Sequence, residues 1–356
     1  MKKIIFFVLL FLTALSGLKS QNIIAVTSAD GTTNVFNTLE NAYQSAKDGD
    51  YIYLPGGTFS LSSVIRKKIN LIGAGHYPDS TVYTNRTIID GSITIGKGAS
   101  NTLIEGLYLI GSIVFAREKT ENAIIRRCNV TSISTSGPWN EHDTMRIWNP
   151  QIINNIIRTH IIVGSTHGFL VKGNIIGSSL STCIYHGGLA QNNIFLTEGE
   201  KTTLGDLRNV TFKNNIFMTK QSLGWQGYAS YGYDGVSGNF NCTFINNLFV
   251  GKDTTLNVIP MALVNIGNKF LVDKESFFVK HSGNSFDYIN DYHLKASSPG
   301  KNAGDDATDV GIYGTSEPYK ASALPSNPHI SFKEIPSSTL PNGTLPLKIK
   351  VSAQER

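Results

Sequence analysis

The sequence is poor in charged residues and in cysteine. Asp, Glu, Lys and Arg make up 16% of the 356 residues, against about 25% in an average soluble domain. Together with 40% hydrophobic residues, this scarcity argues against a disordered chain and against a charged helical bundle. Three cysteines exclude a disulfide-stapled miniprotein, and their spacing does not match a zinc site. We therefore expect Cys128, Cys183 and Cys242 to be small buried apolar side chains.

The net positive charge is also small once the first 20 residues are set aside. The formal net charge is +5, and Lys2, Lys3 and Lys19 supply three of these charges, so the rest of the chain carries +2. A surplus of this size is too small to favour a nucleic-acid partner.

Long apolar segments are missing apart from one near the N-terminus. The basic residues Lys2 and Lys3 precede an apolar run over 4–15, and small and polar residues follow as far as Ser20. This pattern predicts a signal peptide over residues 1–20, and hence a secreted, periplasmic or cell-surface protein. The run is shorter than the ~20 residues of a spanning helix, and no later segment reaches that length, so we expect no membrane insertion.

Glycine and asparagine are abundant, with 34 and 31 copies, and the asparagines mark an internal repeat. An alternating strand precedes each marker asparagine and a second short strand follows it, at intervals of 19 to 32 residues. This period indicates one solenoid coil per repeat, and an asparagine at each bend allows the stacked side-chain amides to bond to one another. The aligned residues are Asn129, Asn155, Asn174, Asn193, Asn215, Asn247 and Asn268.

Several segments outside the repeats carry a family resemblance. Asn37 and Glu40 form a capping-box-like pair that opens an expected short helix over 38–46. The motifs that follow are DGDYIYLPGGTF (48–59), INLIGAG (69–75) and, after the coils, the closing-coil motif SPGKNAGDDATDVGIYG (298–314). Over about residues 22–315 the chain resembles the right-handed parallel β-helices of the pectin-lyase-like superfamily.

The resemblance implies an all-β fold. We expect a right-handed parallel β-helix over residues 21–315, with a helical N-terminal cap that protects the open edge of the first coil. Residues 316–356 then form a short C-terminal β extension, with extended segments at 330–332 and 347–351. This extension is either a cap on the solenoid or a segment that docks to another protein. The superfamily contains polysaccharide lyases, glycoside hydrolases, phage tailspikes and non-catalytic surface proteins, so the resemblance is specific for fold and not for chemistry.

The repeat register places two columns of side chains before the bend. Seven residues before the aligned asparagines stand Asn122, Trp148, His167, His186 and Arg208. Nine residues before them stand Arg146, Ser165, Ile184 and Asp206. The intervening Ile147, Tyr185 and Leu207 are apolar, with Thr166 the exception, so we expect both columns to face outward. In the enzymes that the fold resembles, the substrate groove lies on this strand, and the stripe here would be Arg146, Trp148, His167, His186, Asp206 and Arg208.

Such a stripe fits the chemistry of an acidic polysaccharide. A lyase needs a base for the proton beside the uronate carboxylate, and His186 or His167 would supply it. Arg208 or Arg146 would hold the carboxylate, and Trp148 would stack on a sugar ring. The alternative is that these turn residues only form hydrogen bonds between coils. Two aromatic-rich insertions are candidate walls of the groove, or else pack over the solenoid; they contain Trp139, Asp143, Trp225, Tyr228 and Tyr231.

No cofactor is expected. The chain lacks the Asp clusters with which pectate lyases hold calcium and polygalacturonases catalyse hydrolysis, and no evident site supports a calcium ion. Asp305, Asp306 and Asp309 are better explained by hydrogen bonding in turns. Asp143 and Asp206 lie three coils apart, too far for a glycosidase pair. Three hypotheses remain: a lyase acting on an acidic glycan, a non-catalytic glycan-binding β-helix, and an adhesive module whose tail docks to an assembly.

Overall fold

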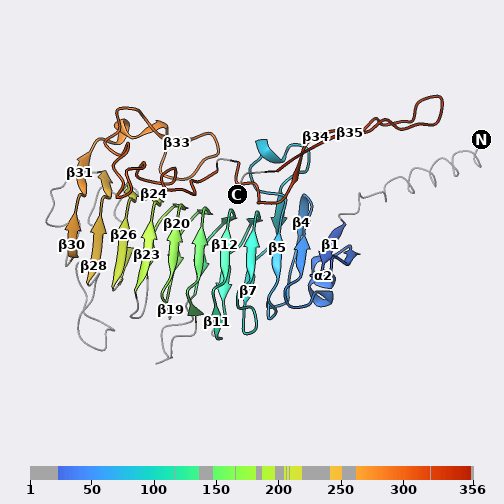
Figure 1. The fold of residues 1–356 in the computed structure, drawn as a ribbon, viewed down its shortest axis with the longest axis horizontal. Coiled ribbons are helices and arrows are strands. Elements are labelled where there is room, and N and C mark those ends of the chain that lie inside the picture. Colours follow the sequence, from blue (N-terminus) through green and yellow to red (C-terminus); the bar gives the residue numbers. More distant parts are fainter. Residues whose placement is uncertain are drawn as a thin grey trace, which may run out of the picture.

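The protein is a parallel β-helix in which short strands of successive coils stack into long sheets (Figure 1). The computed structural model describes residues 23–116, 118–135, 147–164, 166–181, 187–196, 204–205, 207, 209–218, 241–250, 262–320 and 322–353. The predicted all-β fold class is confirmed. Within the described residues, α2 (Leu39–Ser45) is the one helix that is longer than a single 3-10 turn.

Four sheets form the solenoid, here called sheets A to D. Sheet A contains β2 (Thr33–Phe36), β1 (Ile24–Thr27), β3 (Tyr51–Tyr53), β5 (Asn70–Ile72), β8 (Leu103–Glu105), β12 (Ile124–Arg126), β16 (Gln151–Ile153), β20 (Leu170–Lys172), β23 (Gly188–Gln191), β26 (Val210–Lys213), β28 (Cys242–Ile245) and β30 (Ala262–Ile266). Sheet B contains β4 (Gly57–Phe59), β6 (Thr87–Ile89), β9 (Tyr108–Leu109), β13 (Asn129–Val130), β17 (Ile156–Ile157), β21 (Ile175–Ile176), β24 (Ile194–Phe195), β27 (Ile216–Phe217), β29 (Leu248–Val250) and β31 (Lys269–Val272).

Sheet C contains β7 (Ile93–Ile95), β10 (Ile113–Phe115), β14 (Ile133–Ser134), β18 (Ile161–Ile162), β22 (Leu180–Ser181) and β25 (Leu204–Gly205). Sheet D contains β11 (Thr120–Glu121), β15 (Ile147–Trp148) and β19 (Thr166–His167). Two antiparallel hairpins follow, β32 (Phe278–Lys280) with β33 (Asp291–Leu294) and β34 (His329–Glu334) with β35 (Lys348–Ser352). The 3-10 turns are η1 (Asp79–Thr81) and η2 (Lys274–Ser276).

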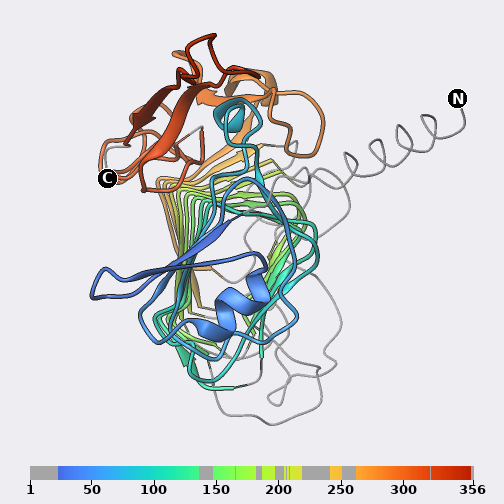
Figure 2. The same ribbon diagram turned by 90° about the vertical axis from the view of Figure 1, so that its right-hand side faces the viewer.

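Helix α2 lies across the N-terminal end of the solenoid, as predicted for a lid (Figure 2). Its cap differs from the predicted Asn37 and Glu40 pair. Thr38 is the N-cap residue, and its hydroxyl accepts a hydrogen bond from the Asn41 amide at 3.2 Å. The Glu40 carboxylate instead accepts from the backbone amides of a nearby loop, from Ser62 at 3.0 Å and from Ser63 at 3.2 Å.

The bend between sheets A and B is held by a ladder of stacked asparagines. In each step the backbone amide and the side-chain Nδ2 of one asparagine donate to Oδ1 of the next, as from Asn174 to Asn193 at 2.9 and 3.0 Å. Each Nδ2 also donates to a strand carbonyl, so the buried amides are satisfied. The ladder residues are Asn155, Asn174, Asn193, Asn215, Asn247 and Asn268.

The left-handed backbone at this bend belongs to the residue before the ladder. Asn154 has φ 55° and Asn192 has φ 54°, while Gly173 and Gly267 occupy the same column. The ladder hydrogen bonds and the left-handed backbone conformation therefore belong to two neighbouring residues of each bend.

The predicted register is wrong by one residue in the first repeat. Asn129 pairs with Ile156, and Cys128 occupies the ladder position, where its backbone amide donates to Asn155 Oδ1 at 2.9 Å. The Asn129 side chain instead donates to Tyr288 Oη at 2.9 Å. Cys128 and Cys242 are buried thiols, as predicted, and burial raises the pKa of Cys128 to about 12; Cys183 lies outside the described residues.

The chain after β31 covers the outer face of sheet B (Figure 2). The sheet B strands are therefore buried on both faces, and neighbouring apolar residues face opposite sides. Ile157 of β17 lies in the solenoid core, and Ile194 of β24 lies under the cover. The segment 298–314, predicted to close the last coil, contains no strand and runs back over the bend. There Asp305 Oδ1 accepts from Asn214 Nδ2 at 2.6 Å, and the Gly311 carbonyl accepts from Asn192 Nδ2 at 3.0 Å.

Beneath this cover, His76 makes stability depend on pH. The imidazole is fully buried, with Nδ1 3.1 Å from Tyr288 Oη. Burial, helped by the charge of Arg86, lowers its pKa from 6.5 to about 3. Between these values the unfolded chain binds a proton that the native chain does not, so this contribution is complete above pH 6.5 and is lost as pH falls towards 3. We expect His76→Gln to flatten the decline in unfolding free energy between pH 7 and 5, measured by urea denaturation; an unchanged decline would contradict this assignment.

Candidate functional site

Sheet D places Trp148 and His167 side by side on the surface. The two residues are paired across β15 and β19, and their rings lie 4.4 Å apart between centroids, with an interplanar angle of 43°. Their strand neighbours Ile147 and Thr166 are buried, so the alternation of the strands directs Trp148 and His167 outward. Trp148 is 36% exposed. The outward orientation predicted for these two residues is confirmed.

The column continues towards the N-terminus with Glu121 and not with the predicted Asn122. Glu121 is paired with Trp148, and its carboxylate lies 2.8 Å from Lys119 Nζ. The cause is the register shift of the first repeat. We call Glu121, Trp148 and His167 the sheet D column.

An adjacent asparagine column supplies polar contacts between coils at this corner. Asn122 Nδ2 donates to Asn101 Oδ1 at 3.3 Å, and Asn149 Nδ2 lies 3.5 Å from Asn122 Oδ1. All three have positive φ. Gly168 follows them, and a Cβ there would lie 2.7 Å from Asn149 Oδ1. The alternative for the stripe was that its residues only form hydrogen bonds between coils. Some of these hydrogen bonds are instead made by the adjacent asparagine column.

The remaining predicted site residues lie outside the described residues. These are His186, Arg208, Arg146, Asp206, Asp143, Trp139, Trp225, Tyr228 and Tyr231. The roles proposed for the bases, His167 included, and for the carboxylate clamps therefore stay predictions from the sequence.

Carboxylates near the C-terminus accept hydrogen bonds in turns, as predicted, and two of them also form ion pairs. Asp305 lies 2.9 Å from Lys213 Nζ, and Asp309 lies 2.7 Å from Lys301 Nζ. Asp306 accepts from the Thr308 amide at 3.1 Å. Among the described residues, no three His, Cys, Asp or Glu side chains gather to form a metal site.

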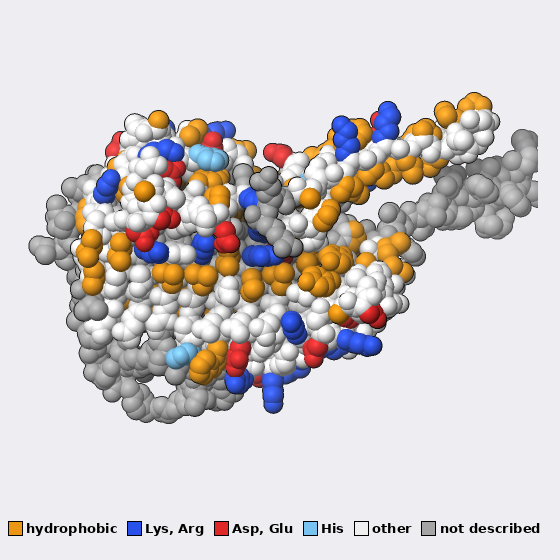
Figure 3. Space-filling model, in the orientation of Figure 1, with side chains coloured by type: hydrophobic (Ala, Val, Ile, Leu, Met, Phe, Trp, Pro, Cys, Tyr) orange, Lys and Arg blue, Asp and Glu red, His pale blue; other side chains and the backbone are white. Residues whose placement is uncertain are grey.

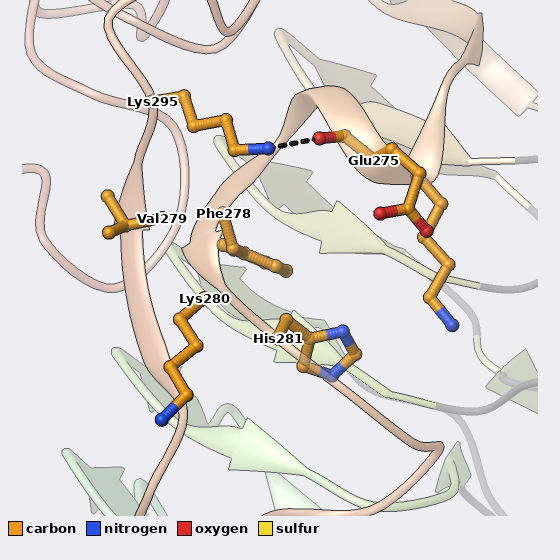
Figure 4. A pocket seen from close by; sticks show the side chains of 7 residues that line it. Glu275, Phe278, Val279, Lys280, His281 and Lys295 are labelled. Carbon is orange, nitrogen blue, oxygen red and sulfur yellow. Dashed lines mark hydrogen bonds between the residues drawn. The ribbon is translucent and has the colours of Figure 1, made fainter.

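A small basic cavity that sequence reasoning missed lies beside η2 and β32 (Figure 4). Its volume is about 180 Å³, and Lys295 Nζ donates to the Glu275 carbonyl at its edge, at 2.6 Å. The signal in the sequence was three lysines and two histidines within residues 274–295. The lining residues are Lys274, Glu275, Phe278, Val279, Lys280, His281 and Lys295.

Comparisons with protein-family models, with curated proteins and with solved structures gave no match to this chain. Within the described residues, no helix combines the length and the apolar character needed to cross a bilayer.

Proposed function

We propose that the protein is a secreted, carbohydrate-active β-helix of the pectin-lyase-like type that binds an extended acidic glycan along the sheet D column. The observation that carries this proposal is the in-register pairing of Trp148 with His167 on an outward-facing strand. An exposed indole ring offers an apolar face on which a sugar ring stacks. The imidazole beside it offers hydrogen bonds one coil further, about 4.8 Å along the axis.

In the catalytic form of this proposal, the protein is a lyase. A neutral imidazole can take the proton beside a uronate carboxylate. His167 or His186 would act as that base, with Arg208 or Arg146 neutralising the carboxylate. The non-catalytic form uses the same surface for binding only.

The test is Trp148→Ala, with affinity for a panel of acidic polysaccharides measured by titration calorimetry. Loss of one stacking partner is expected to weaken binding about tenfold, and Trp148→Phe should retain most of the affinity. Tyr51→Ala is the matched control, since Tyr51 is 41% exposed on another sheet. Equal losses in Trp148→Ala and Tyr51→Ala, or no loss in either, would refute the proposed surface.

The same samples separate catalysis from binding. A rise in the ultraviolet absorbance of unsaturated uronate products that disappears in His167→Ala or His186→Ala would establish the lyase. Binding without any such rise would establish the non-catalytic form.

A further inference from the structure

The hairpin of β34 and β35 stands apart from the solenoid (Figure 1). It is anchored near its base, where the Phe332 ring lies 5.4 Å from the Tyr83 ring. Ser326, just before it, donates from its amide to Glu105 Oε1 at 3.2 Å. All five residues of β35 are exposed. Strand β34 is therefore the anchored strand of the hairpin, and the outer edge of β35 faces solvent.

The hairpin carries an unusual concentration of exposed apolar side chains (Figure 3). An isolated two-stranded sheet is only marginally stable in water, and an apolar surface of this kind marks an interaction site. The large apolar residues concerned, each 44–62% exposed, are Ile335, Leu340, Leu345, Leu347, Ile349 and Val351.

Basic and apolar side chains alternate along strand β35. Lys348 and Lys350 point to one face, while Ile349 and Val351 point to the other. Lys350 Nζ lies 5.7 Å from the centre of the Phe332 ring on the paired strand. Within the described part of the chain, the sheet contains only β34 and β35, so the outer edge of β35 has no strand beside it.

We propose that the outer edge of β35 accepts an extended strand of another protein in which acidic and apolar residues alternate. An acidic side chain would lie beside Lys350, and apolar side chains beside Ile349 and Val351, whereas Lys348 is already paired with Glu334, 3.1 Å away. A second copy of the chain fits less well. Antiparallel self-pairing that brings Ile349 beside Val351 also places Lys350 opposite Lys350, and like charges in that position are destabilising. This inference is independent of the glycan surface.

The experiment uses the full chain and a synthetic peptide of about ten residues that alternates glutamate and valine. A peptide of the same composition with its glutamates in one block is the control ligand. We expect fluorescence anisotropy to show tighter binding of the alternating peptide, and amide exchange over residues 347–352 to slow when it binds. Lys350→Glu should weaken binding about fivefold or more, and Lys350→Gln should weaken it less.

Lys280→Glu is the matched control variant, because Lys280 is an exposed lysine beside the 53% exposed Val279 in the other hairpin. It should leave the peptide affinity unchanged. The proposal is overturned if both peptides bind equally, if Lys350→Glu binds as tightly as the unmodified chain, or if sedimentation shows self-association that the hairpin variants abolish. Unchanged circular dichroism in the two Lys350 variants would show that a loss of binding is not a loss of folding.

Discussion

Replacing Asn193 by alanine is expected to lower the free energy of unfolding by about 3 kcal/mol. Asn193 is fully buried in the middle of the ladder. Its Oδ1 accepts from the Asn174 backbone amide at 2.9 Å, and its Nδ2 donates to the Val171 carbonyl at 2.9 Å. Truncation deprives both backbone groups of these partners, and each unsatisfied buried group costs about 1–3 kcal/mol. Urea denaturation followed by circular dichroism measures the loss.

Asn154→Gly is the matched control for the ladder. Asn154 lies at the same bend but in the left-handed column, where φ is 55° and where Gly173 already stands in the next coil. Glycine adopts this conformation without strain, so we expect a change within about 1 kcal/mol. If Asn154→Gly were as destabilising as Asn193→Ala, the stability of the bend would not depend on the ladder.

The periodicity of the sequence was sufficient for the ladder and for the outward orientation of Trp148 and His167. Both follow from short-range rules, namely the alternation of a strand and the near-constant length of a coil. The predicted register of the repeats is wrong at Cys128, where the sequence departs from this regular pattern. Asn129 resembles a ladder residue in sequence, but its buried side chain bonds to Tyr288, 159 residues away. No local pattern carries that information.

The cover over sheet B was predictable in part. Strands such as Ile175–Ile176 are apolar at consecutive positions, which is typical of strands buried on both faces. The pattern indicates that something covers the sheet, but it does not say which segment. That choice depends on contacts over long sequence separations, such as the 242 residues between Tyr77 and Tyr319, whose hydroxyls lie 3.1 Å apart.

One of these long-range contacts is a buried carboxylate that fastens the end of the C-terminal segment. Glu105 is fully buried, and Oε2 accepts from Arg126 Nη2 at 2.8 Å while Oε1 accepts from Arg127 Nη1 at 3.1 Å. Oε1 also accepts from the backbone amide of Ser326 at 3.2 Å, and Arg127 Nη1 donates to the Leu324 carbonyl. Burial lowers the pKa of Arg127, which shows how poorly this position tolerates an unpaired charge. One carboxylate therefore pairs with two guanidinium groups and binds a segment from the far end of the chain.

Glu105→Gln is accordingly expected to lower the free energy of unfolding by about 3–5 kcal/mol, since it leaves buried positive charge without its partner. Glu118→Gln is the matched control, because Glu118 pairs with Arg66 at the surface, where such a pair contributes about 0–1 kcal/mol. The loss should be accompanied by faster proteolysis between residues 322 and 335 under native conditions, because Ser326 loses its acceptor. A Glu105→Gln variant as stable as Glu118→Gln, with unchanged cleavage, would mean that the apolar cover alone retains the C-terminal segment.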